Sequence, residues 1–275
     1  MFFYKMALEF EVMSRAIGSN PGGKCIYKEG CDERMVYLKH CVSSRVSSRD
    51  SSFVFPHQPV YEAVTFEMAR KIGLHTPFFY VVLNEGNDVN FHDGEGVKSK
   101  IKPKQSCYFA SDILPILRGD IELEEEKVKR ESIYRDLLQV SDIVGRGQNY
   151  FLDRFKQKLF YLDLGCSFVD AHEGFIQLKT SHPDILNKKM FKRFMKKLSR
   201  YSLICNDNET LLGLDEFVRM PYEITIPTLN PKGRRRLDTL ISEEEVDEIV
   251  NRLASGIVKC KLLKKNGESE FLVKA

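Results

Sequence analysis

The sequence lacks the features that mark several large classes of protein. No stretch approaches the roughly 20 uninterrupted apolar residues of a membrane-spanning helix, and Lys5, Glu9 and Glu11 interrupt the apolar N-terminal segment. The seven cysteines are scattered and form no C-x-x-C pair, so neither a disulfide framework nor a zinc knuckle is indicated. We therefore expect a soluble, cytoplasmic protein with reduced thiols.

A dominant charge and the common hydrolase motifs are also absent. The 42 basic and 39 acidic residues give a net charge of +3, which provides no field of one sign, so no nucleic-acid partner is expected. The six histidines are isolated and no G-x-S-x-G motif occurs, so zinc-enzyme and serine-hydrolase functions are not indicated. The 275 residues, 43% of them hydrophobic, suffice for one large domain or for two lobes that share a cleft.

The hydrophobic pattern predicts a strand-rich first part. Residues 9–41 contain three short segments typical of strands, and apolar positions at helical spacing predict a helix over 60–72 that ends at Gly73. Two further strands are predicted at 78–83 and 106–114. The segment between them, 84–96, is rich in Asn, Asp and Gly, and it is predicted to be a loop.

The second part of the chain predicts mostly helices. The charged run 118–132 is expected to be a solvated surface, and a helix is predicted around 131–143. Two apolar segments, 150–152 and 158–164, flank a basic turn and predict a hairpin. Ser242 followed by Glu245 has the pattern of a capping box that opens the last helix. The pattern therefore predicts an α+β fold.

A glycine-rich segment lies between the first two predicted strands. Gly18, Gly22 and Gly23, followed by Lys24, would allow the backbone to approach a phosphate group closely. The ordinary interpretation of such a segment is a simple hairpin turn. Its position at the front of the chain makes it a candidate phosphate-binding loop.

A lysine and a glutamate follow in the order that a nucleotide cleft needs. Lys39 lies in the third predicted strand, on the face opposite to Val36 and Leu38. Glu62, on the next helix, would hold the Lys39 ammonium for the phosphates of a nucleotide. Glu67 is the competing candidate, and the ordinary interpretation is an edge lysine with solvated helix glutamates.

The strongest cluster lies around the predicted hairpin. Asn149 precedes its first strand, and the motif Leu162-Asp163-Leu164-Gly165 closes its second strand, with Asp163 fourteen positions after Asn149. Amide and carboxylate oxygens are ligands that Mg²⁺ prefers. Asn149 and Asp163 are therefore predicted to be the metal ligands.

This layout resembles the atypical branch of the protein-kinase superfamily, which includes HipA-like kinases and phosphatidylinositol 3- and 4-kinases. The resemblance covers residues 9–175, and its best local match is Glu62-x6-Ala69-x3-Gly73-Leu74-x2-Pro77, which favours Glu62 over Glu67. It implies ATP and Mg²⁺ as cofactors and adenine placed near Ser111 to Ile113. It also implies an N-terminal antiparallel sheet lobe with one helix (1–108) and a mainly helical C-terminal lobe (109–275).

One position departs from the family pattern. The family carries a catalytic Asp five residues before the metal-binding Asn, and that position is Val144 here. The nearest carboxylate upstream is Asp142, which would serve as the base if the glycines at 145 and 147 allow the turn to bulge. Otherwise the base is missing, and the chain is a pseudokinase that holds nucleotide or a partner without phosphotransfer.

The acceptor is left open between a protein Ser/Thr and a phosphoinositide. The basic helix predicted at 188–200 and the run Arg234 to Arg236 are the dense positive segments. They would seat an anionic membrane surface or an inositol phosphate, although the ordinary interpretation is a solvated face. A compact two-lobed chain also resembles bacterial secreted effector kinases, which would act in the host cytosol.

Overall fold

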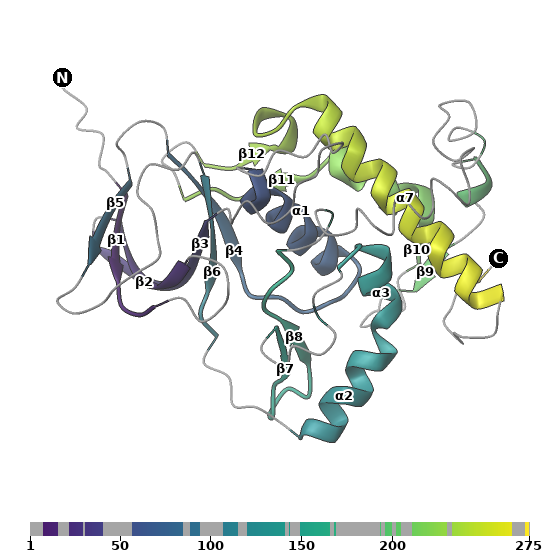
Figure 1. Cartoon of the computed structure of the whole chain (residues 1–275), viewed down its shortest axis with the longest axis horizontal. Coiled ribbons are helices and arrows are strands. Elements are labelled where there is room, and N and C mark those ends of the chain that lie inside the picture. The colour runs from purple at the N-terminus through teal and green to yellow at the C-terminus, as the bar shows by residue number, and fades with distance from the viewer. Residues whose placement is uncertain are drawn as a thin grey trace.

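The structure is a computed structural model, and it describes the following residues: 8–15, 22–29, 31–40, 57–84, 89–93, 107–114, 120–140, 143, 149–165, 168, 193, 196–199, 202–204, 211–229, 233–265 and 273–274. The chain has mixed α and β content, as expected for an α+β fold. The main sheet is formed by its first part, and most helices belong to its second part (Figure 1).

The main sheet has six strands in the order β4-β6-β3-β2-β1-β5. Their bounds are Leu8–Val12 for β1, Gly22–Glu29 for β2, Asp32–His40 for β3, Phe79–Leu83 for β4, Val89–Asp93 for β5 and Cys107–Asp112 for β6. The predicted strands in 9–41, 78–83 and 106–114 are thus confirmed. Strand β6 spans residue 108, the boundary between the two lobes that the resemblance implies.

Strand β5 corrects two expectations. It lies inside 84–96, which was expected to be a loop, and it pairs with β1 in parallel, whereas the other neighbouring strands of the sheet are antiparallel. Two apolar residues of β5 lie among polar neighbours and pack against the sheet. Val89 is buried, and the ring of Phe91 stacks on Phe10 with centroids 5.7 Å apart.

The sheet curls on itself. Phe91 of the edge strand β5 contacts Tyr108 of β6 at a centroid distance of 5.2 Å, although three strands separate β5 and β6 in the sheet order. The concave face therefore encloses its own apolar cluster. Its buried members are Leu8, Phe10, Val12, Cys25, Tyr27, Val36, Leu38, Val82, Val89, Tyr108, Ala110 and Leu229.

Helix α1, Gln58–Lys71, covers the other face of the sheet. Pro59 lies in its first turn, where a missing amide hydrogen costs nothing. Gly73 ends it with a φ of 88°, and the amides of Gly73 and Leu74 donate to the carbonyls of Arg70 and Ala69. This is a Schellman motif. It fixes the predicted helix end at glycine.

The aromatic contacts of α1 bind it to the sheet. Phe66 lies 5.5 Å from Phe79 of β4 and 4.9 Å from Phe109 of β6, measured between ring centroids. All three side chains are fully buried. Burial of an aromatic side chain contributes about 1.5–3 kcal/mol, so this contact holds α1 firmly against the sheet.

A segment from the second half of the chain returns to the sheet. The amide of Val81 donates to Pro227 O at 2.9 Å, and the amide of Leu229 donates to Val81 O at 3.1 Å. Val81 and Thr228 form a parallel bridge. This segment covers the open edge of β4, which would otherwise present unpaired backbone groups.

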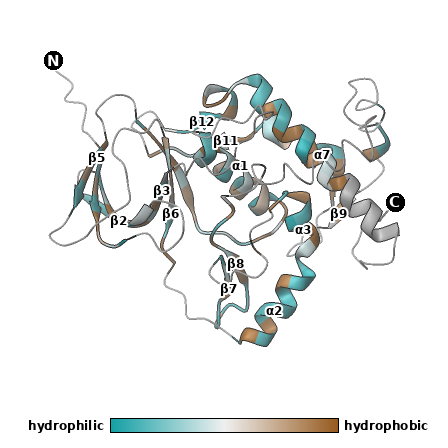
Figure 2. Ribbon diagram, in the orientation of Figure 1, coloured by the Kyte–Doolittle hydropathy of each residue, from teal (hydrophilic) through white to brown (hydrophobic). Residues whose placement is uncertain are grey.

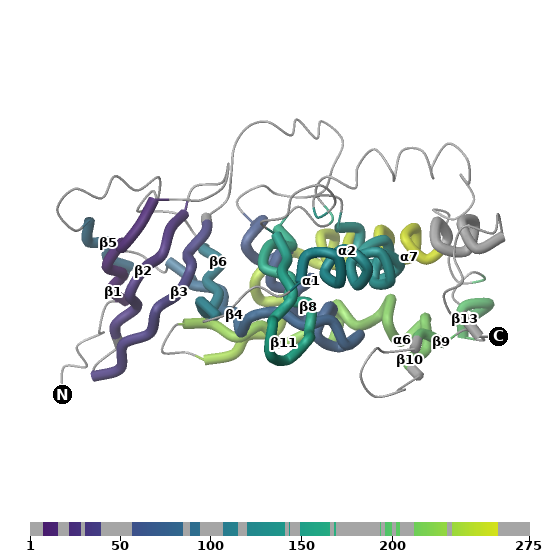
Figure 3. The backbone as a smooth tube through the Cα atoms, turned by 90° about the horizontal axis from the view of Figure 1, so that it is seen from below, coloured from purple at the N-terminus to yellow at the C-terminus, as the bar shows by residue number. Residues whose placement is uncertain are grey.

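The second part of the chain combines helices with small sheets. Its helices are α2 (Ile121–Arg130), α3 (Ser132–Leu137), α6 (Leu214–Arg219), η3 (Met220–Tyr222), η4 (Leu237–Thr239) and α7 (Glu243–Lys265). Its strands are β7 (Tyr150–Leu152), β8 (Leu159–Tyr161), β9 (Ser202–Ile204), β10 (Leu211–Gly213), β11 (Thr225–Ile226), β12 (Arg235–Arg236) and β13 (Val273–Lys274). In Figure 3 the main sheet lies at one end of the molecule and α7 extends toward the other end, where it packs against α3 and α6.

The β7–β8 hairpin confirms its prediction, and helix α2 covers it. Hydrophilic residues dominate α2 (Figure 2), as expected for the charged run 118–132, but Glu124 is only 1% exposed. Its carboxylate accepts the amide hydrogen of Leu152 at 2.7 Å. One acidic residue of this run therefore supports the hairpin instead of facing solvent.

The capping box at the start of α7 is present, and its Glu245 makes additional contacts that were not predicted. The Ser242 amide donates to Glu245 Oε2 at 3.0 Å, and the Glu245 amide donates to Ser242 Oγ at 3.3 Å. Glu245 Oε1 also accepts from Tyr61 Oη and lies 2.8 Å from His57 Nδ1. Burial acts to raise the pKa of Glu245, but these hydrogen bonds hold it below its usual value.

Replacement of Glu245 by alanine is expected to lower the free energy of unfolding by about 1–3 kcal/mol, because buried partners lose a charged hydrogen-bond acceptor. Glu244→Ala is the matched control, since Glu244 is the exposed neighbour in the same turn. Urea unfolding of both variants measures the difference. Equal stability of the two variants would show that Glu245 does not join α7 to α1.

Candidate functional site

Lys39 lies on the face of β3 that looks toward α1. It pairs with Gly22 of β2 on one side and with Phe109 of β6 on the other. Its neighbours Val36 and Leu38 belong to the apolar cluster on the opposite face, as the alternation predicts. Lys39 is 7% exposed, and its ammonium lies 5.7 Å from the centre of the Phe109 ring. Such a buried charge requires partners.

Two carboxylates supply these partners. Lys39 Nζ lies 2.8 Å from Glu62 Oε1 and 3.0 Å from Asp163 Oδ1. The predicted contact between Lys39 and Glu62 is confirmed. Glu67 is partly exposed and lies on another side of α1, in a hollow lined by Arg70 and other residues. Helix α1 therefore turns Glu62 rather than Glu67 toward Lys39, as the Gly-Leu-x-x-Pro ending indicated.

The turn that contains Asp163 wraps around Glu62. The Gly165 amide donates to Asp163 Oδ1 at 3.1 Å, and a hydrogen bond from the backbone of Leu164 reaches Glu62. A Cβ atom at Gly165 would lie 2.8 Å from Glu62 Oε2. Glycine is thus needed here for the close approach of the two carboxylates.

Gln58 is a site residue that sequence reasoning missed. Its Nε2 donates to Gly165 O at 2.9 Å, and its side chain is buried. It lies one helical turn before Glu62 on the same face of α1. Its spacing of one helical turn from Glu62 is the sequence signal that could have placed Gln58 in the site. Gln58 holds the Asp163 turn in place beside the Lys39 ammonium.

The hairpin brings Asn149 close to the Asp163 turn. The Leu162 amide donates to Asn149 O at 2.7 Å, so Asn149 and Asp163 lie at the same end of the hairpin. Asn149 is 9% exposed, and the Asp163 side chain is 32% exposed. Among the residues that the structure describes, no group of three or more His, Cys, Asp or Glu could hold a metal ion.

This donor set fits Mg²⁺ bound together with a nucleotide. Mg²⁺ is usually held by one or two protein oxygen ligands, with substrate phosphates and waters completing its shell. Asn149 and Asp163 would provide two such ligands. A metal that binds without phosphates would need more protein ligands than these two residues supply.

The glycine-rich segment differs from its prediction. Gly22, Gly23 and Lys24 lie within β2 rather than in the turn before it. A Cβ atom at Gly22 would meet Leu38 O at 2.3 Å, and one at Gly23 would meet Ser14 O at 2.3 Å. The two glycines are therefore needed for close packing of neighbouring strands. A contact with phosphate stays a prediction.

The predicted adenine segment, Ser111 to Ile113, covers the end of β6 and the residue after it. Ser111 is buried and pairs with Tyr37 on one side and with Phe79 on the other. The Ile113 amide donates to Met35 O at 3.5 Å, so it is engaged with the sheet. The placement of adenine near Ser111 and Ile113 stays a prediction.

The electrostatics of the site follow from one ammonium shared between two carboxylates. Burial acts to lower the pKa of Lys39, but the charges of Asp163 and Glu62 outweigh it and raise that pKa above its ordinary value. Burial raises the pKa of Glu62 to about 7; the charge of Asp163 adds to the rise and that of Lys39 opposes it. Lys39 therefore stays charged.

Several predicted residues lie outside the described part of the chain. They are Gly18, Asp142, Val144 and most of the basic helix predicted at 188–200. Of that helix, Arg193, Lys196 and Lys197 are described, and all three are exposed.

Comparisons with known proteins identify no family for this chain. No protein-family model matches the chain, and no curated protein matches it significantly. The described residues also contain no helix that is long and apolar enough to cross a membrane. The functional argument therefore rests on the geometry around Lys39.

The raised pKa of Glu62 makes stability depend on pH. The folded state holds a proton on Glu62 between about pH 4.5 and pH 7, where the unfolded state has lost it. The Glu62 contribution to stability therefore falls as pH rises through this window. Glu62→Gln removes this titration, and its melting temperature is expected to decline less than that of the wild type from pH 4.5 to 7.

Glu67→Gln is the matched control, because Glu67 lies on the same helix outside the site. Melting curves at several pH values give the slope of melting temperature against pH for the wild type, Glu62→Gln and Glu67→Gln. A slope for Glu62→Gln that equals those of the wild type and of Glu67→Gln would contradict the raised pKa.

Proposed function

We propose that the chain is an ATP- and Mg²⁺-dependent phosphotransferase of the atypical kinase type, acting on a protein Ser/Thr or on a phosphoinositide. The observation that carries the proposal is the position of the Lys39 ammonium between Glu62 and Asp163. A strand lysine, a helix glutamate and an aspartate after a hairpin form the nucleotide-handling set of kinases. Their order along this chain is the same.

In this proposal the chain has two lobes, residues 1–108 and residues 109–275. Lys39 and Glu62 belong to the first lobe, and Asn149 and Asp163 belong to the second. A nucleotide would lie between them. The buried face of β3 and the Asp163 turn would then contact its phosphates from opposite sides.

Each residue has a defined role in the transfer. Lys39 binds the α and β phosphates, and Glu62 orients its ammonium. Asn149 and Asp163 hold Mg²⁺, which supplies neutralisation of phosphate charge when bound. Asp163 reaches solvent with about a third of its side chain exposed, so a metal ion has access to it.

Gln58 and Gly165 are positioning residues in this scheme. Their hydrogen bond at 2.9 Å fixes the Asp163 turn, and transfer depends strongly on such positioning. Asp142 is the proposed base for the acceptor hydroxyl. Because Val144 occupies the family's usual position for that base, a second candidate function is nucleotide binding without transfer.

ATP with Mg²⁺ is expected to raise the melting temperature of the wild type. A ligand that binds only the folded state at 100 times its Kd adds about 2.7 kcal/mol. Asp163→Ala should lose the metal-dependent part of this shift. Asp238→Ala, an exposed change at η4, should keep it. An unchanged wild-type melting curve at millimolar MgATP would refute the nucleotide site.

Asp142→Asn is expected to keep the affinity for ATP and to lose turnover by about 10² to 10⁴, the usual effect of removing a general base. Calorimetry measures the binding, and labelled ATP measures transfer to protein and lipid acceptors. Val144→Asp is the companion variant. If Asp142→Asn turns over like the wild type, Asp142 is not the base and the transferase is an unconventional one. If only Val144→Asp confers transfer, the wild-type chain binds nucleotide without transfer.

A further inference from the structure

A hollow lies on the side of α1 that faces away from Lys39. Its volume is about 380 Å³, within the range of small-molecule sites. It is bounded by the end of α1, the start of β4 and the β11–β12 hairpin, which lie together in Figure 1. Its lining residues are Glu67, Arg70, Lys71, Phe78, Thr225, Pro227 and Arg234.

The hollow is rich in positive charge. Arg70, Lys71 and Arg234 contribute three cationic groups against the single carboxylate of Glu67. Arg234 is the first residue of the basic run 234–236 that stands out in the sequence. The fold thus joins this run to two basic residues more than 160 positions earlier. Arginine and lysine together are the residues that recognise phosphate groups.

Part of the hollow is already shaped before any ligand arrives. The Arg70 guanidinium lies 5.0 Å from the centre of the Phe78 ring, a cation–π contact that limits its motion. Pro227 is held by the hydrogen bond from Val81 to its carbonyl oxygen. Phe78 is 41% exposed, so its ring and Pro227 offer an apolar wall beside the cations.

We propose that this hollow binds a phosphorylated polyol, such as an inositol phosphate or a sugar phosphate. The cations would bind the phosphates, and the apolar wall would contact a carbon ring. Glu67 would repel a bare phosphate but accepts hydrogen bonds from hydroxyl groups. A ligand with both phosphates and hydroxyls fits this combination. The site is distinct from the Lys39 site and does not depend on the proposed function.

Binding in this hollow would join separate parts of the chain. Arg70 and Lys71 end the helix that carries Glu62, whereas Arg234 precedes β12. A phosphate held by both groups would tie α1 to the β11–β12 hairpin. Bound ligand is therefore expected to raise the melting temperature, because it binds only the assembled hollow.

Isothermal titration calorimetry of the full chain tests the proposal with four probes: inositol 1,4,5-trisphosphate, fructose 1,6-bisphosphate, inorganic phosphate and uncharged myo-inositol. At least one phosphorylated polyol is expected to bind, and to bind more tightly than inorganic phosphate or myo-inositol. Binding of inorganic phosphate as tight as that of both phosphorylated polyols, or no binding of either, would overturn it.

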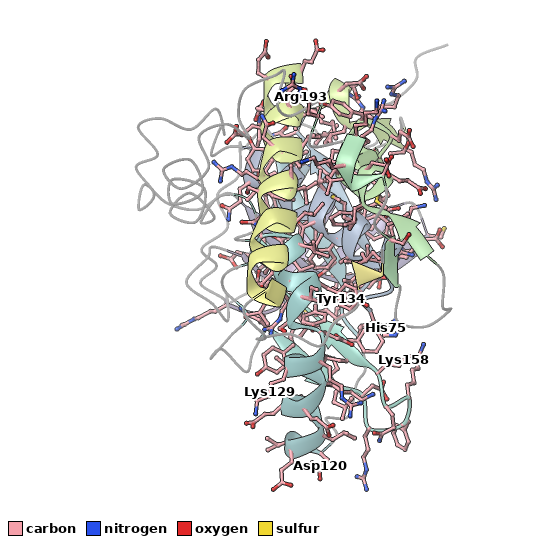
Figure 4. The ribbon with its side chains drawn as sticks, turned by 90° about the vertical axis from the view of Figure 1, so that its right-hand side faces the viewer. His75, Asp120, Lys129, Tyr134, Lys158 and Arg193 are labelled. Carbon is pink, nitrogen blue, oxygen red and sulfur yellow. The ribbon has the colours of Figure 1, made fainter. Side chains whose placement is uncertain are left out.

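The double variant Arg70→Glu, Arg234→Glu is expected to weaken polyol phosphate binding by about tenfold or more, because each lost charge-assisted hydrogen bond typically has this effect. Lys129→Glu with Arg154→Glu is the charge-matched control. Both control residues are exposed, and Figure 4 shows Lys129 on α2. Equal weakening in both double variants would indicate long-range charge only and would overturn the proposal.

Two further arms complete the test. If the melting curve shows that the double variant does not fold, Arg234→Ala alone, an exposed change, replaces it with the same expectation of weaker binding. Vesicles that carry phosphatidylinositol bisphosphate distinguish a lipid headgroup from a free ligand: binding to them assigns the first, and binding of the soluble probe alone assigns the second.

Discussion

The rest of the structure depends on the buried ammonium of Lys39. An unpaired charge at 7% exposure would be strongly destabilising, so β3, α1 and the turn after β8 must stay close enough for Glu62 and Asp163 to reach it. Removal of one partner from a buried ion pair typically costs about 3–5 kcal/mol. Three distant parts of the chain are thus fixed by one cation, and Gln58, Gly165 and the hairpin serve to keep them there.

The same cluster carries an excess of negative charge. Two carboxylates share one ammonium, and burial adds to the repulsion between them, which explains why Glu62 is a weak acid. A divalent cation beside Asp163 would relieve this excess and would release Lys39 for an anionic ligand. Lys39 would then exchange one of its two carboxylate partners for the ligand.

The sequence predicted the elements with strong local signals. The spacing of apolar residues and Gly73 located α1, and alternation placed Lys39 opposite Leu38. The contact of Lys39 with Glu62 was predicted, whereas Asp163 was expected only as a metal ligand, and its contact with Lys39 was not predicted. Strand β5 was missed because its two apolar residues are surrounded by Asn and Asp. Its stability comes from pairing in parallel with β1, which lies at the start of the chain. Gln58 was missed because its contact with Gly165 is made across more than 100 residues, where no local pattern exists.

The return of residues 227–229 to the edge of β4 affects how the chain folds. During synthesis the first half emerges with this edge unpaired, and the apolar cluster on the concave face is not complete until Leu229 has arrived. Contacts of such long sequence separation form late and slowly. The edge of β4 is therefore covered only after most of the second half has left the ribosome, and the first half alone would expose a strand edge open to association with other chains.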